Sequence, residues 1–202
     1  ADAGGEYSPP HADTDSALPR ERIVSPPVSH PFASASMSTS SFSTCDLCDP
    51  HRDTVTPDFV VLPPVFRDFG SPAPFCGQVV TVRCYEDNTS VRAVLETEGH
   101  GRVLVVAGGG SLRTALVGGN IGQLAARNHW AGVVVDGCVR DVAELVPLPV
   151  GIRALGSMPM PPRKNHAGLV DVPVHVQGVL VRPGSWLYAD ADGMVVSDTP
   201  LA

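Results

Sequence analysis

The stretch "VVVDGCVRDVAEL", residues 133–145, sets an arginine beside an aspartate shortly after a run of apolar residues. Asp141 offers a hard oxygen ligand of the kind that Mg²⁺ or Mn²⁺ takes, often with only one or two protein carboxylates and several waters. Arg140 offers a planar guanidinium fork for a substrate carboxylate or keto oxygen. The alternative is an ordinary surface ion pair in which the aspartate favours the start of the next helix. Residue chemistry alone leaves both interpretations open.

A second candidate lies in "VVAGGGSLRTALVGGN", residues 105–120. It does not fit a nucleotide loop, because Arg113 stands where a dinucleotide fingerprint needs glycine and no Gly-Lys-Ser/Thr follows. The pair Gly118 and Gly119 precedes a predicted helix that begins near Asn120, and bare backbone N–H groups at a helix start bind carboxylates or phosphates. The alternative is that these glycines serve only a tight turn and close packing.

Two other patterns resemble metal sites but are incomplete. Cys45 and Cys48 with His51 have the spacing of half a zinc site, but no second pair follows at zinc-finger spacing. The stretch "DADG", residues 190–193, lacks the later acidic ligands of a calcium loop. We interpret the first as small, half-buried thiols and the second as a turn.

The elements that must position these residues alternate between strands and helices. Apolar runs predict strands, and apolar residues at helical spacing predict the helices between them. The predicted order is strand 76–84, helix 86–99, strand 102–106, helix 120–130, strand 132–136 and strand 150–156. This alternation implies right-handed parallel crossovers in a covered sheet. Ligands gather beyond the carboxyl ends of such strands, so the loops after residues 106 and 136 are expected to face one crevice.

The two ends of the chain have a different texture. Residues 1–40 are rich in Pro, Ser, Ala and acidic residues and are predicted to be a disordered extension, with a single domain over residues 41–202. After Pro162 the pattern predicts strands only, over residues 172–181 and 185–197, the second range with a hairpin turn at Asp192-Gly193. The fold class is therefore α/β, with parallel crossover units and a β-rich C-terminal half.

Composition excludes several classes of function. With 202 residues and a formal net charge of -7, the chain has no broad cationic surface, so direct binding to nucleic acid or to an anionic membrane is not expected. No apolar run approaches the roughly 18 residues of a membrane span. The N-terminus has neither the basic start nor the apolar stretch of a secretory signal, so we expect a cytoplasmic protein.

Several ordered motifs together resemble the RraA-like family, which comprises regulators of ribonuclease E activity and related 4-hydroxy-4-methyl-2-oxoglutarate aldolases. The motifs are "FCGQVVTV", "VLVVAGGGSLRTALVGGN", "WAGVVVDGCVRD", "ALGSMP" and "PGSWLYADADGMVVS". The resemblance covers nearly all of the chain after residue 40. It implies a swivelling β/β/α-type domain that assembles into a ring-shaped homotrimer with active sites at subunit interfaces.

The resemblance also implies roles for particular residues. Asp141 corresponds to the aspartate that holds a divalent metal, Mg²⁺ or Mn²⁺, through one side chain and waters, and Arg140 to the arginine that contacts the keto acid. The family's glycine loop corresponds to Gly118, Gly119, Asn120 and Ile121. The implied reaction is a metal-dependent retro-aldol cleavage to pyruvate and a second keto acid, with oxaloacetate decarboxylation through the same pyruvate enolate.

Two departures bear on this activity. Gly119 stands where many of these aldolases have an aspartate assigned to a catalytic water, and Ala107 stands where related sequences read "DGGG". The alternative function is a regulator that binds and inhibits an RNase E-like ribonuclease, for which an acidic protein suits the enzyme's basic surfaces. Retention of both Arg140 and Asp141 favours the enzyme. No Schiff-base lysine is required, and Lys164 is the only lysine in the chain.

Overall fold

The computed structural model describes residues 42–53, 56 and 58–201. Residues 1–40, for which the sequence predicts a disordered extension, lie outside the described residues, and that boundary stays a prediction. Within the described ranges, no helix is both long and apolar enough to cross a membrane.

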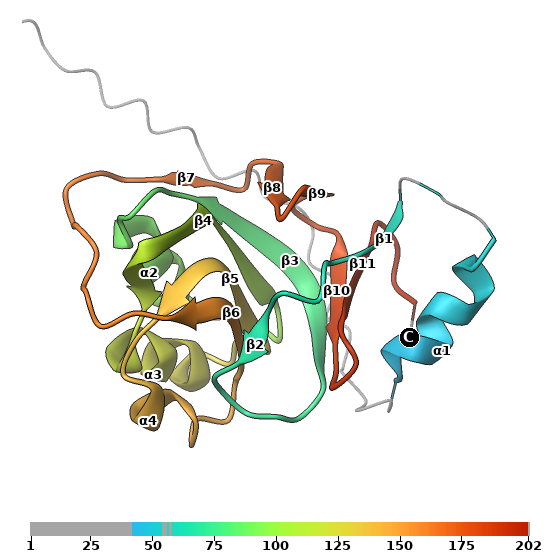
Figure 1. Ribbon diagram of the computed structural model, residues 1–202, viewed down its shortest axis with the longest axis horizontal. Coiled ribbons are helices and arrows are strands. Elements are labelled where there is room, and N and C mark those ends of the chain that lie inside the picture. The colour runs from blue at the N-terminus through green and yellow to red at the C-terminus, as the bar shows by residue number, and fades with distance from the viewer. Residues whose placement is uncertain (1–41, 54–55, 57, 202) are drawn as a thin grey trace, which may run out of the picture. The chain divides into compact units, whose positions relative to one another are not determined.

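One mixed sheet has the strand order β1-β11-β10-β3-β4-β5-β6-β2, with β7 paired to β3 (Figure 1). Its strands are β1 (Phe59–Val61), β2 (Arg67–Asp68), β3 (Phe75–Arg83), β4 (Val103–Val117), β5 (Gly132–Val139), β6 (Gly151–Ser157), β7 (Leu169–Val170), β10 (Trp186–Ala189) and β11 (Met194–Ser197). The neighbours β3, β4, β5 and β6 pair in parallel, and the flanking strands pair antiparallel. The predicted mixture of parallel units and a β-rich C-terminal half is confirmed.

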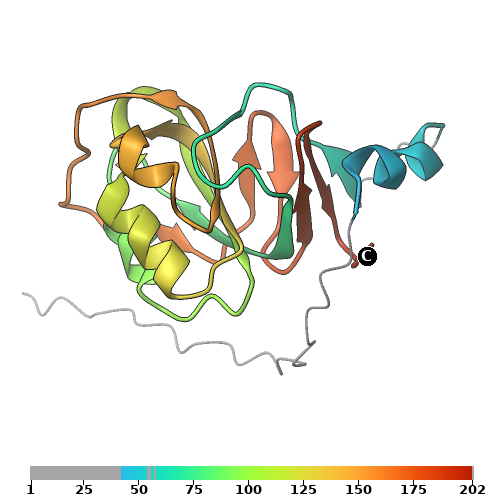
Figure 2. The same ribbon diagram turned by 90° about the horizontal axis from the view of Figure 1, so that it is seen from below.

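Helices connect the parallel strands. They are α2 (Thr89–Leu95), α3 (Gly119–Arg127) and α4 (Val142–Leu145), while α1 (Thr44–Cys48) and a 3-10 turn (Asp49–His51) come before the sheet. Figures 1 and 2 show α2, α3 and α4 together on one side of β3 to β6. The predicted crossovers are therefore present, one between each pair of consecutive parallel strands.

The buried valines explain why these strands read as continuous apolar runs. On β5, Val133 and Val135 pack in the core under the helices, whereas Val134 packs in a second core against the C-terminal strands. Successive side chains of a strand point to opposite faces, so a strand covered on both faces favours apolar residues at consecutive positions, as at residues 133–135.

Several predicted boundaries differ from the structure. The helix predicted over 86–99 is only α2, because Glu86 has a φ of 52° and the backbone turns there. The strand predicted over 102–106 continues through the glycines to Val117, with register shifts against β5 that mark bulges. The single strand predicted over 172–181 is wrong: it is a hairpin of β8 (Val174–Val176) and β9 (Val179–Val181).

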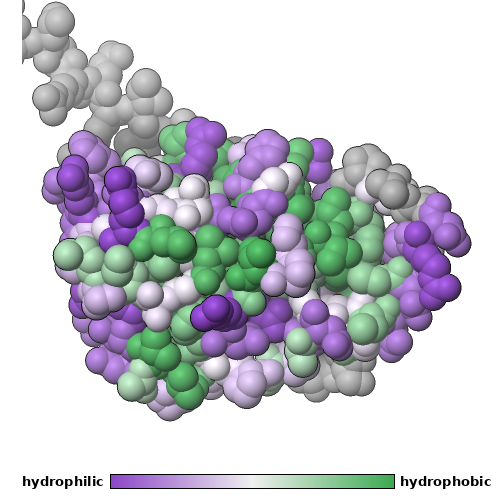
Figure 3. Space-filling model, in the orientation of Figure 1, coloured by the Kyte–Doolittle hydropathy of each residue, from purple (hydrophilic) through white to green (hydrophobic). Residues whose placement is uncertain are grey.

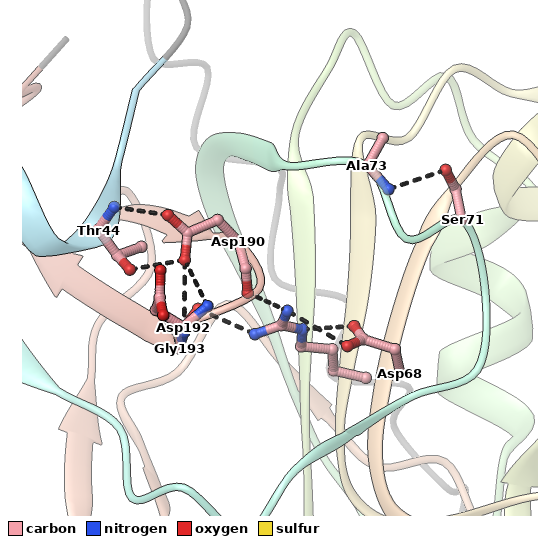
Figure 4. Close-up of polar contacts among 8 residues, drawn as sticks. Thr44, Asp68, Ser71, Ala73, Asp190, Asp192 and Gly193 are labelled. Atoms are coloured by element: carbon pink, nitrogen blue, oxygen red, sulfur yellow. Dashed lines mark hydrogen bonds and ion pairs between the residues drawn. The ribbon is translucent and has the colours of Figure 1, made fainter.

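A buried arginine, Arg153, connects the edge of the sheet to the C-terminal hairpin. Figure 4 shows its partners Asp68, Asp190 and Gly193. Arg153 on β6 holds the Asp68 carboxylate, with 2.7 Å between Nε and Oδ1, and donates to the backbone carbonyls of Gly193 and Asp190. Asp190 in turn accepts from the backbone N–H and hydroxyl of Thr44, both at 2.6 Å. The "DADG" stretch is thus a turn that anchors α1, as its interpretation as a turn predicts.

The Cys45 and Cys48 thiols lie on α1 near this turn. All five cysteines are free thiols, and Cys45 is exposed, so the expected half-burial of the pair holds for Cys48 alone. The negative charge of Asp192 together with burial raises the pKa of Cys45, and burial together with Asp49 raises the pKa of Cys48. Because the thiolate is the reactive and metal-binding form, these surroundings disfavour reactivity at the pair.

Candidate active site

A cavity of about 290 Å³ opens beyond the carboxyl ends of β4 and β5. Gly118 directly follows β4 and Arg140 directly follows β5, so the two connections meet at the carboxyl ends of these strands. The predicted strand ends at residues 106 and 136 are wrong, because both strands continue to residues 117 and 139. The lining residues are Asn88, Thr89, Arg92, Ala115, Gly118, Asn120, Ile121, Arg140, Asp141, Pro161, Pro162 and Lys164. The sequence-predicted site residues therefore lie together, with Gly119 held beside the cavity through its backbone.

Asp141 has an unusual backbone conformation, with φ 56° and ψ 45°. For a residue other than glycine this left-handed geometry is uncommon and marks a locally imposed turn. Its carboxylate does not cap its own helix α4; Oδ2 instead accepts from the Gly119 backbone N–H and from Arg140 Nε, each at 3.2 Å. The Asp141 carboxylate therefore does not cap α4 and is bound instead to the first residue of α3.

Glu144 on α4 lies against Gly119, beside the residues that line the cavity, and no sequence pattern singled it out. A Cβ built on Gly119 would lie 1.9 Å from Glu144 Oε2 and 3.0 Å from its Cβ, so the Glu144 side chain fills the space that a side chain at position 119 would need. The departure from aspartate at position 119 thus coincides with a carboxylate arriving from α4. The available signal was spacing, since Glu144 comes three residues after Asp141 at the start of a helix.

The opposite wall of the cavity is built around Asp87, which is 5% exposed. One of its carboxylate oxygens accepts from the backbone N–H groups of Asn165 at 2.7 Å and His166 at 2.9 Å, and the other accepts from the Thr89 N–H at 2.9 Å. This carboxylate therefore ties the loop that carries Lys164 to the start of α2. The neighbouring Asn88 donates to the Leu116 carbonyl at 3.0 Å and fixes the same turn to β4.

The charge of the cavity is mainly positive. Arg92, Arg140 and Lys164 line it, and Asp141 is the acidic residue among the described lining residues. In a chain with a formal net charge of -7, this gathering of cations is local. Such a site attracts small anionic ligands. Figure 3 shows hydrophilic side chains gathered at the end of the molecule where the segment between β6 and β7 runs.

The donor set at the cavity suits a hard divalent ion rather than zinc. Among the described residues, no three His, Cys, Asp or Glu side chains come together in a metal-binding group. This excludes a zinc-like cage within those residues but fits Mg²⁺, which keeps several waters and takes one or two carboxylates. Asp141 would hold such an ion.

Asp87→Asn is expected to lower the free energy of unfolding by about 2 kcal/mol, because an amide NH₂ would face a backbone donor and one charge-assisted acceptor would be lost. Urea unfolding at neutral pH measures this. Burial alone raises the pKa of Asp87, but its hydrogen bonds from Thr89, His166 and Asn165 outweigh burial and lower the pKa to about 2. Because the pKa of Asp87 is lowered in the folded protein, its contribution to the free energy of unfolding is fully present above pH 3.8. This contribution is lost as the pH falls through about 2.

The matched control is Asp58→Asn, an exposed aspartate whose side chain makes no hydrogen bond or ion pair with the described residues. Its effect should stay within about 0.5 kcal/mol. Equal stability of the two variants would show that Asp87 does not clamp the loop.

Comparison with known proteins identifies the family of the chain. Residues 44–196 match the family model RraA-like, described as Aldolase/RraA. A protein of Albidiferax ferrireducens provisionally named 4-hydroxy-4-methyl-2-oxoglutarate aldolase is 60% identical over 167 residues, covering 79% of this chain and 96% of its own length.

Solved structures agree in fold but carry other names. The RNA-processing inhibitor RraA from Thermus thermophilis is 48% identical, with a TM-score of 0.75 and coverage of 81% of this chain and 96% of that one. A Geobacillus kaustophilus structure, named S-adenosylmethionine: 2-dimethylmenaquinone methyltransferase, is 41% identical, with a TM-score of 0.72 and coverage of 79% and 97%. These names describe different activities, so chemistry must be argued from the site. The ordered motifs, the mixed α/β domain and the match over residues 44–196 show that this chain belongs to the RraA-like family.

Proposed function

We propose that this protein is a divalent-metal-dependent pyruvate aldolase, acting on 4-hydroxy-4-methyl-2-oxoglutarate, with oxaloacetate decarboxylase activity. The observation that carries the proposal is the Arg140 and Asp141 pair, held across the start of α3 at the mouth of a cationic cavity. The provisional aldolase name of the Albidiferax ferrireducens relative supports the same reaction class.

Arg140 and Asp141 have different roles in this proposal, set by their opposite charges. The Arg140 guanidinium binds the keto acid and stabilises the negative charge that develops on the C2 oxygen as the bond between C3 and C4 breaks. Asp141 would hold Mg²⁺ or Mn²⁺, and such an ion would supply Lewis-acid polarisation of the keto group. The backbone N–H of Gly119 and the guanidinium of Arg140 keep the Asp141 carboxylate oriented. The loop of Gly118, Gly119, Asn120 and Ile121 shapes the substrate end of the cavity.

A base must also take the proton from the C4 hydroxyl of the aldol substrate. Once that proton leaves, the C4 oxygen becomes a carbonyl, the bond between C3 and C4 breaks, and its electron pair moves onto the C2 oxygen. The resulting pyruvate enolate is then protonated at C3. Glu144 supplies a carboxylate beside Gly119. This is the position where the family resemblance implies an aspartate in many of the aldolases. Oxaloacetate needs no such base, because its bond breaks with loss of carbon dioxide.

The decisive experiment measures pyruvate release from both substrates with Mg²⁺ or Mn²⁺ and then with excess chelator. We expect turnover with metal and its loss with chelator, restored by adding metal back. The blank contains metal without protein, because divalent ions alone decarboxylate oxaloacetate. Turnover without metal would contradict the proposal that Asp141 holds a catalytic metal. If folded protein released no pyruvate above the blank, the proposed enzyme activity would be wrong.

A second candidate function is favoured by a specific similarity. The chain is 48% identical to the RNA-processing inhibitor RraA from Thermus thermophilis. In this alternative the protein binds an RNase E-like ribonuclease and inhibits it through surface contacts, without binding RNA. Binding assays with such a ribonuclease, using wild type and a site variant, separate the two functions, because surface inhibition should not depend on Asp141.

The ring-shaped homotrimer remains a prediction that suits both functions. Exposed apolar side chains lie near the cavity: Tyr85, Leu112 and Met160 are 62%, 56% and 58% exposed. Arg113, which adjoins Leu112, donates to the Tyr85 hydroxyl at 3.3 Å, and the Met160 carbonyl accepts from the N–H of Ala115, which lines the cavity. A second subunit covering these side chains would close the open side of the site.

A further inference from the structure

Lys164 is a feature of the cavity that the reaction at Arg140 and Asp141 leaves unused. It is the only lysine of the chain, and it lines the cavity from the segment between β6 and β7. Its ammonium makes no hydrogen bond or ion pair with the described residues. The other cation on this wall, Arg92, is already paired with Glu96 at 2.8 Å. A positive charge at a ligand cavity with no protein partner among those residues calls for a negative group on the ligand.

The backbone on both sides of Lys164 is fixed. The Arg163 N–H donates to the Glu86 carbonyl at 2.9 Å, and the N–H groups of Asn165 and His166 donate to Asp87. The lysine is therefore presented from an anchored stretch of chain, although its side chain is exposed. Such anchoring lowers the entropy lost when a ligand orders the ammonium.

Lys164 and Arg140 reach the cavity from different elements. Arg140 follows β5 and is held against Asp141 at 3.2 Å, whereas Lys164 lies on the wall tied to α2 through Asp87. Two separate cationic groups suit a ligand with two anionic groups. A cavity of about 290 Å³ is at the small end of the usual range for ligands, roughly 300–1,000 Å³. The ligand class is thus a small dianion rather than a bulky cofactor.

We propose that Lys164 binds the second carboxylate of a dicarboxylic 2-oxo acid and selects dicarboxylic over monocarboxylic substrates. This inference rests on the proposed function, since it takes the keto acid end of the substrate to lie at Arg140 and Asp141. Lys164 acts as a specificity residue and takes no part in bond breaking.

The kinetic test compares Lys164→Met and Lys164→Arg on 4-hydroxy-4-methyl-2-oxoglutarate and on its monocarboxylic analogue, 4-hydroxy-4-methyl-2-oxopentanoate. Loss of one charge-assisted hydrogen bond costs a factor of about 10 to 100 in affinity. We expect Lys164→Met to raise KM for the dicarboxylic substrate by that factor, with kcat nearly unchanged and no effect on the analogue. Lys164→Arg should restore most of the loss. Equal effects on both substrates would overturn the proposal.

Arg163→Met is the matched control. It removes an exposed positive charge from the adjacent position, which does not line the cavity. Its KM for the dicarboxylic substrate should stay close to that of the wild type. A similar rise in both variants would show that net charge, rather than contact with Lys164, controls binding.

A labelling test does not depend on turnover. Because the chain has one lysine, acylation at that side chain can be followed by mass spectrometry without ambiguity. With Mg²⁺ present, 2-oxoglutarate should slow acylation of Lys164 and 2-oxobutanoate should not. Protection in a protein that releases no pyruvate would keep the dicarboxylate site while rejecting the aldolase. Equal acylation rates of Lys164 with 2-oxoglutarate and with 2-oxobutanoate would overturn the proposal. Borohydride trapping of a keto acid on Lys164 would also overturn it, because the lysine would then take part in the chemistry.

Discussion

Asp141→Asn is expected to lower metal-dependent pyruvate release by about 10³-fold in kcat/KM, because it removes the acidic group of the cavity that can hold a divalent ion. Asparagine suits this position better than alanine as a test. It tolerates the left-handed backbone at φ 56° and can still accept the Gly119 N–H, so the turn should keep its shape. The rate is measured with saturating Mg²⁺ and compared with the wild type under chelator.

Arg140→Lys provides the companion measurement. A lysine keeps the charge but not the planar fork, so keto acid affinity should fall about tenfold while metal affinity is retained. Pyruvate binding reports the first quantity and Mn²⁺ binding the second. Turnover of Asp141→Asn at the wild-type rate would show that the metal binds elsewhere. Pyruvate affinity of Arg140→Lys equal to that of the wild type would show that Arg140 does not bind the substrate.

The part of the site that sequence predicts is the part built from neighbouring residues. Arg140 and Asp141 end an apolar run, and Gly118 and Gly119 precede an amphipathic helix, so both follow from strand and helix patterns. Parallel crossovers then bring the two loops to one edge of the sheet. The parallel crossovers and the meeting of these two connections were therefore accessible without coordinates, whereas the order of the antiparallel strands that flank them was not.

The cavity wall that contains Lys164 could not be predicted from the sequence. Lys164 lies far along the chain from α2, and the link between them is a buried carboxylate, Asp87, bound to backbone N–H groups. Any residue can supply a backbone donor, so the sequence around Asn165 and His166 carries no trace of the contact. Glu144 was missed for a related reason: its role becomes visible only through the space left at Gly119.

The missed hairpin at β8 and β9 has a local cause. Valines alternate with other residues on both sides of the turn, so "VPVHVQGVLV" reads as one strand. The chain turns at Gln177 and Gly178, which have φ values of 49° and 84°. A Gln-Gly turn lacks the strong signal of Asn-Gly or Asp-Gly, because glutamine rarely adopts positive φ.

Arg153→Met should have the largest effect on stability, lowering the free energy of unfolding by about 3 kcal/mol. The arginine side chain is 9% exposed and satisfies three groups from two segments: the Asp68 carboxylate on β2 and the carbonyls of Asp190 and Gly193 in the turn between β10 and β11. Methionine fills much of the same volume but donates nothing, so both carbonyls and one carboxylate lose their donor. Urea unfolding monitored by far-UV circular dichroism measures the change.

Arg67→Met is the control, because Arg67 lies on β2 beside Asp68, is exposed, and makes no side-chain hydrogen bond or ion pair with the described residues. It should change the free energy of unfolding by less than about 0.5 kcal/mol. In Arg153→Met, hydrogen exchange should also rise first at Thr44, whose N–H is bound by the Asp190 carboxylate. Uniform exchange across the sheet would mean that Arg153 stabilises the whole domain rather than anchoring this corner, and unchanged stability would mean that the buried contacts contribute nothing net.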